Sequence, residues 1–460
     1  TMGGAIAIAA VFEALGAFIG GGDVVKTIKK GIIDIDAFGG NVDPFIWAMM
    51  AALLAAALWL NFATMMKAPV STTHSIVGGV MGAGIAAAGF TIVSWGTMGK
   101  IAASWVISPV LGGIIAATFL YAIKKSMVYK EDKIGAAKKW VPIFVAIMSW
   151  AFITYLTLKG LKKVWPSIVD VLVFLPDAKK PSFLIAAIFG LIIAGIVYIL
   201  VKKTVENRAN SLENTRASIN LLFTVPLIFA AILLSFAHGA NDVANAIGPL
   251  AAINDAVMTG GISAKAGIPI WVMAVGALGI ALGLALYGPK LIRTVGSEIT
   301  DLDQMRAFSV AMAASITVII ASQLGLPVSS THIAVGGIFG VGFLREYLAS
   351  SGQEEVIEKE EISIEDEKKV LKAYTSELKT LEEKDKKTKA DYERIVALYK
   401  LIDVEEAKIK ASKKHIKSVE KVKYVKRDAV KKIIAAWVIT VPAAAVLSAV
   451  IFFMIRGIVL

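Results

Sequence analysis

Long apolar stretches alternate with short polar ones along most of this 460-residue chain. Eleven of them have about the twenty residues that a helix needs to cross a bilayer. They cover residues 3–22, 45–66, 70–89, 101–123, 140–158, 183–201, 219–239, 267–288, 305–325, 328–346 and 433–456. The pattern predicts an all-α protein that crosses the membrane many times.

The long polar stretch 347–431 breaks this pattern, because it is rich in Glu and Lys. Within 353–430, apolar residues recur at helical spacing on both sides of a polar run at Lys384–Lys389: Leu371, Tyr374, Leu378 and Leu381 before it, and Ile395, Leu398, Ile402 and Ile409 after it. This spacing predicts a soluble helical hairpin with a narrow apolar seam. A solvated spacer without a binding function fits the same pattern.

One apolar motif occurs twice. Residues 69–84 read PVSTTHSIVGGVMGAG, and residues 327–342 read PVSSTHIAVGGIFGVG. Pro followed by hydroxyl residues is typical of a helix start, where Ser and Thr cap unpaired N–H groups. The shared glycines let helix backbones approach closely. Two such helix starts at equivalent places indicate a transporter whose site lies between repeats.

The repeat extends further along the chain. Leu15-Gly16 corresponds to Leu282-Gly283, and Trp105-Val106-Ile107 corresponds to Trp437-Val438-Ile439. Segment 219–266 has no counterpart in the first half, so we expect one further helix and its loop upstream of Thr1. Each half then has five spans and two more connect them, so the halves should insert in opposite directions, as an inverted repeat with broken or re-entrant helices at its centre.

These boundaries divide the chain into a first membrane repeat, 1–123, two connecting helices, 124–218, and a second repeat, 219–346 and 432–460, which the hairpin 347–431 interrupts. We expect a multi-pass protein of the plasma (inner) membrane, with 347–431 in the cytoplasm and the C-terminus outside. The lysines of loop 124–139 agree with this orientation, whereas those of loop 159–182 do not.

Composition supports the membrane assignment. Apolar residues make up 57% of the chain and the mean hydropathy is +0.70, which excludes an ordinary soluble protein. The net charge of +12 is concentrated in loops, so it indicates topology and lipid contact rather than nucleic-acid binding. The basic run 408–432 beside a span favours anionic lipid. There is no Cys, and no Walker A, zinc or catalytic-triad motif, so we do not expect an enzyme.

The segment Gly239-Ala-Asn-Asp-Val-Ala-Asn245 carries the most distinctive polar residues. It places Asn241, Asp242 and Asn245 at the end of an apolar helix. A carboxylate in such a span needs a partner, and three oxygen-bearing side chains at a helix break suit a small cation such as Na⁺. A capped helix end, with Asp242 satisfied by backbone N–H groups, explains the spacing as well.

The repeated motif supplies candidate anion ligands. The hydroxyl residues are Ser71, Thr72, Thr73, Ser329, Ser330 and Thr331. Helix starts favour anions, and hydroxyls donate hydrogen bonds without adding charge. Helix capping or interhelical hydrogen bonding is the alternative for either cluster, and the duplication makes that alternative weaker.

Four further polar residues lie near these segments. His74 and His332 directly follow the hydroxyl clusters, where they either donate to the anion or, as we favour, brace the loop. Glu13 lies in mid-span, and a buried acid in a membrane is usually functional, although a structural pairing fits too. Gln323 lies four residues before Pro327 and either lines the cation site or joins helices.

Three pieces of sequence together resemble the inorganic phosphate transporter (PiT) family: Gly239–Pro249, the two Pro-Val-Ser-[Ser/Thr]-Thr-His segments, and Phe12–Gly16. The resemblance implies an inverted repeat of five plus five helices and symport of phosphate with Na⁺, or with H⁺. It implies that Asn241, Asp242 and Asn245 serve the cation and substrate sites, that the six hydroxyl residues bind phosphate, and that Glu13 takes part in transport. One departure is the missing first copy of the Asn-Asp segment.

The prediction is therefore a secondary transporter that imports inorganic phosphate with Na⁺ by alternating access, as a symmetric homodimer. Coupling to H⁺, with Asp242 or Glu13 titrating, and sulfate transport on the same scaffold are the alternatives. A channel or receptor that acts through its hairpin is the rival from another class.

Overall fold

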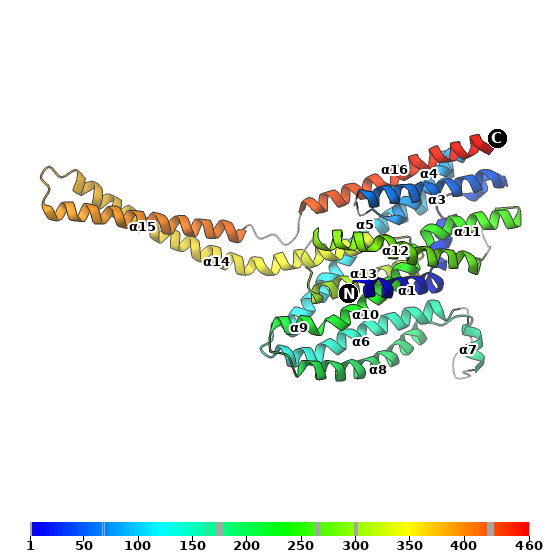
Figure 1. Cartoon of the computed structure of the whole chain (residues 1–460), viewed down its shortest axis with the longest axis horizontal. Coiled ribbons are helices and arrows are strands. Elements are labelled where there is room, and N and C mark those ends of the chain that lie inside the picture. Colours follow the sequence, from blue (N-terminus) through cyan, green and yellow to red (C-terminus); the bar gives the residue numbers. More distant parts are fainter. Residues whose placement is uncertain are drawn as a thin grey trace. The chain divides into compact units, whose positions relative to one another are not determined.

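The computed structural model describes residues 2–66, 68, 70–162, 164–171, 178–262, 267–298, 302–420 and 427–459. It has two compact units: one comprises Thr1–Val341 and Lys426–Leu460, and the other Gly342–Val425. The described residues form helices and turns, with one isolated β-bridge between Ile33 and Val93. The predicted all-α fold is therefore confirmed (Figure 1).

Nine helical segments of the described chain are long and apolar enough to cross a membrane. They lie in α1 (Met2–Gly20), α3 (Val42–Met65), α5 (Trp95–Ile123) with its π-helical extension (Lys124–Val128), α6 (Lys133–Gly160), α8 (Phe183–Ala209), α10 (Thr224–Asp242) with α11 (Ala244–Thr259), α12 (Ile270–Glu298), α13 (Gln304–Gln323) and α16 (Arg427–Val459). Shorter helices are α2 (Gly22–Lys30), α7 (Trp165–Val171) and α9 (Arg216–Leu222).

The two expected spans that carry the repeated motif are not among these nine. The first forms α4 (Thr72–Ala88), which has 17 residues and begins at the hydroxyl cluster. The second begins α14, which runs from Ser330 to Glu382. Each helix begins at the residue that directly follows the Pro-Val-Ser sequence of its motif copy. The predicted helix starts are therefore present in the structure.

The Asn-Asp segment lies at a break between two helices. α10 (Thr224–Asp242) ends at the aspartate, and α11 (Ala244–Thr259) begins two residues later. Val243 at the junction keeps a helical backbone, with φ −56° and ψ −30°. Two helices therefore meet at the segment where the sequence predicts a break, with Asp242 and Asn245 on either side of the junction.

The motif glycines allow reciprocal helix packing. A Cβ at Gly82 of α4 would lie 2.1 Å from the carbonyl oxygen of Ala445 in α16. A Cβ at Gly340, the equivalent residue of α14, would lie 2.1 Å from the carbonyl oxygen of Gly113 in α5. Each motif helix thus packs at backbone distance on the tryptophan-bearing helix from the other half of the sequence.

The second unit contains the predicted hairpin, formed by the later part of α14 and by α15 (Lys389–Glu420), which run side by side (Figure 1). The turn falls between Glu382 and Lys389, where the sequence predicts it. Leu378, Leu398 and Ile409 are buried along the seam. Lys384 and Thr388 donate to the Asp391 carboxylate beside the turn and hold its pKa well below the usual range.

Candidate functional site

The first hydroxyl of each motif copy caps its helix. The Ser71 Oγ accepts a hydrogen bond of 3.1 Å from the His74 backbone N–H, and the Ser329 Oγ accepts one of 3.3 Å from the His332 backbone N–H. Both serines are buried. The two helix starts therefore have the same capped geometry. The residues that follow the caps, Thr72 and Ser330, lie between the two helix starts.

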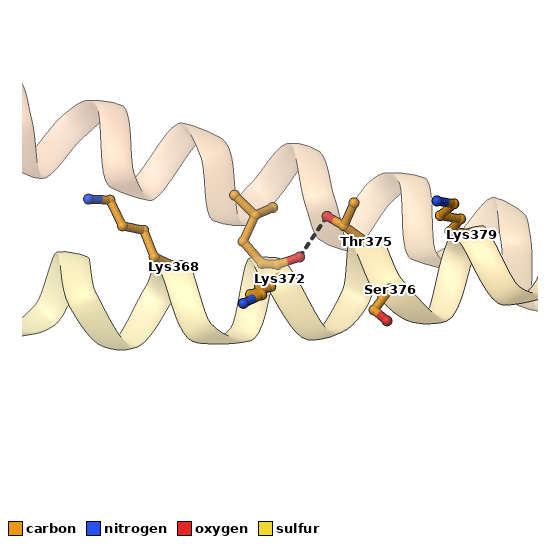
Figure 2. Close-up of a pocket in the computed structure, with 6 residues that line it drawn as sticks. Lys368, Lys372, Thr375, Ser376 and Lys379 are labelled. Carbon is orange, nitrogen blue, oxygen red and sulfur yellow. Dashed lines mark hydrogen bonds between the residues drawn. The ribbon is translucent and has the colours of Figure 1, made fainter.

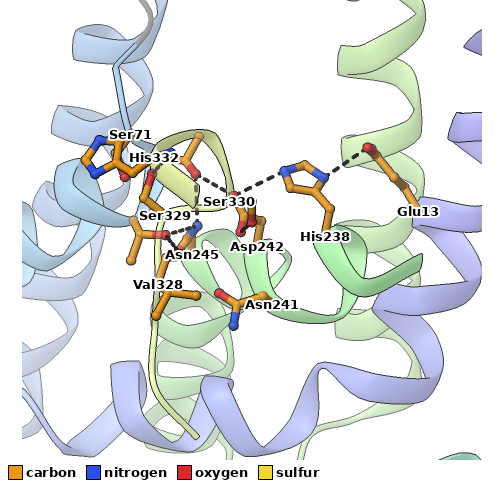
Figure 3. A network of polar contacts seen from close by, with 12 residues as sticks. Glu13, Ser71, His238, Asn241, Asp242, Asn245, Val328, Ser329, Ser330 and His332 are labelled. Carbon is orange, nitrogen blue, oxygen red and sulfur yellow. Dashed lines mark hydrogen bonds and ion pairs between the residues drawn. The ribbon is translucent and has the colours of Figure 1, made fainter. Parts of the chain in front are cut away.

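The second hydroxyls of the two copies meet at one carboxylate (Figure 3). Thr72 donates through Oγ1 to Asp242 Oδ2 at 2.9 Å, and Ser330 donates through Oγ to Asp242 Oδ1, also at 2.9 Å. Thr72 and Ser330 occupy equivalent positions of the repeat. Because an ionised carboxylate accepts at both oxygens, Asp242 joins the two motif copies symmetrically.

A histidine links Asp242 to the acidic residue of α1 (Figure 3). His238 Nδ1 lies 2.9 Å from Glu13 Oε1, and its Nε2 lies 3.3 Å from Asp242 Oδ2. Sequence reasoning missed His238, although its separation of four residues from Asp242 puts both side chains on one helix face. The partner that Glu13 requires in the membrane is therefore this imidazole.

Asn245 and Thr73 tie the two motif copies to each other and to α11. Asn245 Nδ2 donates to Thr72 Oγ1 at 3.0 Å and to Thr73 Oγ1 at 3.2 Å. Thr73 Oγ1 in turn donates to the backbone carbonyl of Val328 at 2.9 Å. Thr331, the equivalent of Thr73, is half-buried. The third hydroxyl residues of the two copies thus differ in burial, since Thr73 is buried and Thr331 is half-buried.

Asn241 points away from the Asp242 carboxylate (Figure 3). Its Nδ2 donates to Ser322 Oγ at 2.9 Å and to the Leu326 carbonyl at 3.2 Å. The Oδ1 atoms of Asn241 and Asn245 are buried and have no hydrogen-bond partner among the described residues. Buried carbonyl oxygens without a donor are suitable ligands for a hard cation.

Gln323 does not join this cluster. It is exposed at the C-terminal end of α13, whereas the neighbouring Ser322 is buried and accepts from Asn241. Adjacent residues of a helix point about 100° apart, so only one of the two can face α10. The structure therefore places Ser322, and not the predicted Gln323, beside the Asn-Asp segment.

The two motif histidines form a buried aromatic cluster. His74 packs on Trp105 with ring centroids 3.7 Å apart, His332 stacks on Trp437 at 3.6 Å, and the two imidazoles lie 4.5 Å from each other. The Trp105 indole also donates to the Pro327 carbonyl at 3.1 Å. This packing supports a bracing role for both histidines.

Comparisons of the whole chain with known proteins identify its family. The model of the phosphate transporter family matches residues 1–448. The chain belongs to the phosphate transporter family. The resemblance to PiT proteins is thus confirmed, and the protein is a transporter rather than an enzyme.

Relatives of this phosphate transporter come from bacteria and archaea. A protein of Helicobacter pylori strain J99 is 49% identical over 457 residues, which cover 98% of this chain and 83% of the relative. A protein of Thermococcus kodakarensis is 37% identical over 343 residues, 74% of this chain and 80% of the relative. Both carry the description "Putative phosphate permease".

A solved structure has the same fold as this transporter. It is described as "The sodium-dependent phosphate transporter" and matches with a TM-score of 0.74 at 28% sequence identity. The match covers 98% of this chain and 90% of the solved one. The likeness therefore includes the membrane helices that build the Asp242 site.

The short helix α2 is anchored close to this site, which sequence reasoning did not predict. Lys29 Nζ lies 3.0 Å from Asp255 Oδ2 in α11, and both side chains are 7% exposed. Thr27 donates to the Gly325 carbonyl at 2.7 Å, just before the second motif. At the other end of α2, Asp23 pairs with Lys159 of α6. The transporter thus fixes α2 against three elements.

Proposed function

We propose that this transporter imports inorganic phosphate by symport with Na⁺ through alternating access. The observation that carries the proposal is the Asp242 carboxylate, which holds the second hydroxyl of both motif copies. These hydroxyls are also the best placed donors for a phosphate between the two helix starts. The Thr72 and Ser330 hydroxyls therefore donate either to the Asp242 carboxylate or to phosphate.

Electrostatics then accounts for coupling. A phosphate that approaches Thr72 and Ser330 meets the negative charge of Asp242, and two anions at close range in a buried site repel each other strongly. A Na⁺ ion bound by Asp242, with the buried Oδ1 atom of Asn245 as a further ligand, cancels this repulsion. The carboxylate turns to the cation and releases the hydroxyls to phosphate.

This exchange makes the binding of the two solutes interdependent. Phosphate binds weakly until Na⁺ is present and, by linkage, phosphate tightens Na⁺ binding by the same factor. The name of the similar solved structure, a sodium-dependent phosphate transporter, supports Na⁺ as the coupling ion. The core with both motif copies then moves against the other helices to change access.

The remaining features of the proposal concern topology. The reciprocal glycine contacts of Gly82 and Gly340 support two halves that insert as an inverted repeat. On that arrangement, the protein lies in the plasma membrane with residues 347–431 in the cytoplasm and the C-terminus outside. A symmetric homodimer is the proposed assembly.

Uptake of labelled phosphate into proteoliposomes tests the transport proposal. We expect uptake under an inward Na⁺ gradient, no uptake under a proton gradient alone, and no competition from excess sulfate. Uptake driven by protons alone would replace Na⁺ by H⁺ as the coupling ion. Competition by sulfate would overturn the assigned substrate, and absence of uptake under both gradients would overturn phosphate symport.

A further inference from the structure

The hairpin unit has no net charge, yet its charges are unevenly distributed. Residues 342–425 contain 19 Lys and Arg against 19 Asp and Glu. Two adjoining hollows on the hairpin, which share Lys368 and Leu371, are nevertheless lined mainly by lysines. We call these residues the lysine strip: Lys368, Lys372, Lys379, Lys410, Lys413 and Lys414. Among the described residues that line either hollow, Glu406 is the one acid.

Most cations of the lysine strip have no ion pair with a described residue, whereas several cations elsewhere on the hairpin do. Elsewhere in the described hairpin, Lys369 pairs with Asp366, Lys384 with Asp391, and Arg394 with Glu377. Within the strip, the described residues give a partner only to Lys379, whose Nζ lies 3.8 Å from Glu383. Five neighbouring cations of the strip therefore have no anion partner among the described side chains, although the unit contains as many acids as bases.

The shape of the strip defines the kind of anion that fits. One hollow follows α14 from Lys368 to Lys379, where Thr375 and Ser376 also line it (Figure 2). The other hollow continues from Lys368 to α15, where Lys410, Lys413 and Lys414 line it. Eleven residues of helix alone extend about 16 Å. A single orthophosphate can contact only a small part of such a strip.

We propose that the lysine strip binds an extended phosphate polyanion, of the chemical class of linear polyphosphate. Lysine ammonium groups are mobile point charges that suit successive phosphates without fixed geometry. A chain can lie in the hollows and contact both helices. The site is separate from the Asp242 cluster and does not depend on the proposed transport reaction.

The test uses the full-length protein in nanodiscs of neutral lipid, with binding of a short linear polyphosphate measured by calorimetry. The strip variant carries Lys368→Gln, Lys410→Gln and Lys413→Gln. The matched control carries Lys369→Gln, Lys386→Gln and Lys400→Gln, which remove the same charge from the same hairpin outside the hollows. We expect the strip variant to bind about tenfold more weakly than the control.

Amine acetylation read by mass spectrometry gives a second measurement, which does not depend on variants. Polyphosphate should slow acetylation of the strip lysines relative to Lys369 and Lys400, and orthophosphate at equal phosphorus concentration should not. Equal weakening in both triple variants, or no protection, would overturn the proposal. Protection that appears only in nanodiscs of phosphatidylglycerol would overturn it in favour of a lipid headgroup site.

Discussion

Thr72 and Ser330 are equivalent residues of two motif copies, and each donates a hydrogen bond of 2.9 Å to a different oxygen of the same carboxylate, Asp242. The two hydroxyls are arranged with approximate symmetry around the carboxylate, because each donates to one of its two equivalent oxygens. An anionic substrate that uses the same hydroxyls must displace Asp242, and this displacement is the step that a cation can control.

The first prediction concerns these two hydroxyls. Thr72→Val and Ser330→Ala should each lower the rate of phosphate uptake by about ten- to a hundredfold, because a hydrogen bond to a charged group contributes about 1.5–3 kcal/mol. The two variants should have similar effects. Uptake into proteoliposomes is the measurement, and Thr72→Ser, which keeps the donor, is the control. Normal uptake in both variants would show that these donors do not serve the substrate.

The second prediction concerns helix packing at the motif glycines. Gly82→Ala and Gly340→Ala should each lower the free energy of unfolding by about 1–3 kcal/mol, because the added methyl group overlaps a carbonyl oxygen of the facing helix. Thermal unfolding in detergent measures the loss. Gly99→Ala in α5 is the control, since its Cβ meets no atom within 4 Å. Equal melting temperatures for all three variants would contradict the backbone contact.

The third prediction concerns the buried ion pair between α2 and α11. Lys29→Met leaves the Asp255 carboxylate buried without its cation and should destabilise the protein by about 3–5 kcal/mol. Adding Asp255→Leu to Lys29→Met removes the unpaired charge and should restore most of the lost stability. Melting temperatures of the single and double variants measure this rescue. A double variant no more stable than Lys29→Met would argue against charge pairing.

Much of this architecture could be predicted from sequence, because the signals are local. The capped helix starts follow from Pro and hydroxyl residues, and the break after Asp242 follows from the polar Asn-Asp segment within an apolar helix. The hairpin turn follows from the polar run between Glu382 and Lys389. Each of these features depends on residues that are neighbours in the chain.

The contacts between distant helices could not be predicted in the same way. Lys29 and Asp255 meet because α2 packs against α11, and no periodicity in either helix indicates this contact. Gln323, predicted to line the cation site or to join helices, is exposed, and the buried Ser322 beside it contacts Asn241, because one residue along a helix changes the face that a side chain occupies. His238 is different, because its separation of four residues from Asp242 is a signal that the sequence contains.

Na⁺ dependence of phosphate affinity tests the central claim most directly. It requires the phosphate Kd of the purified protein without Na⁺ and with saturating Na⁺, for the wild type and for Asp242→Asn. We predict that Na⁺ tightens phosphate binding in the wild type and leaves it unchanged in Asp242→Asn, since the neutral amide no longer repels the anion. The same Na⁺ dependence in both proteins would contradict the role of Asp242 as the coupling group.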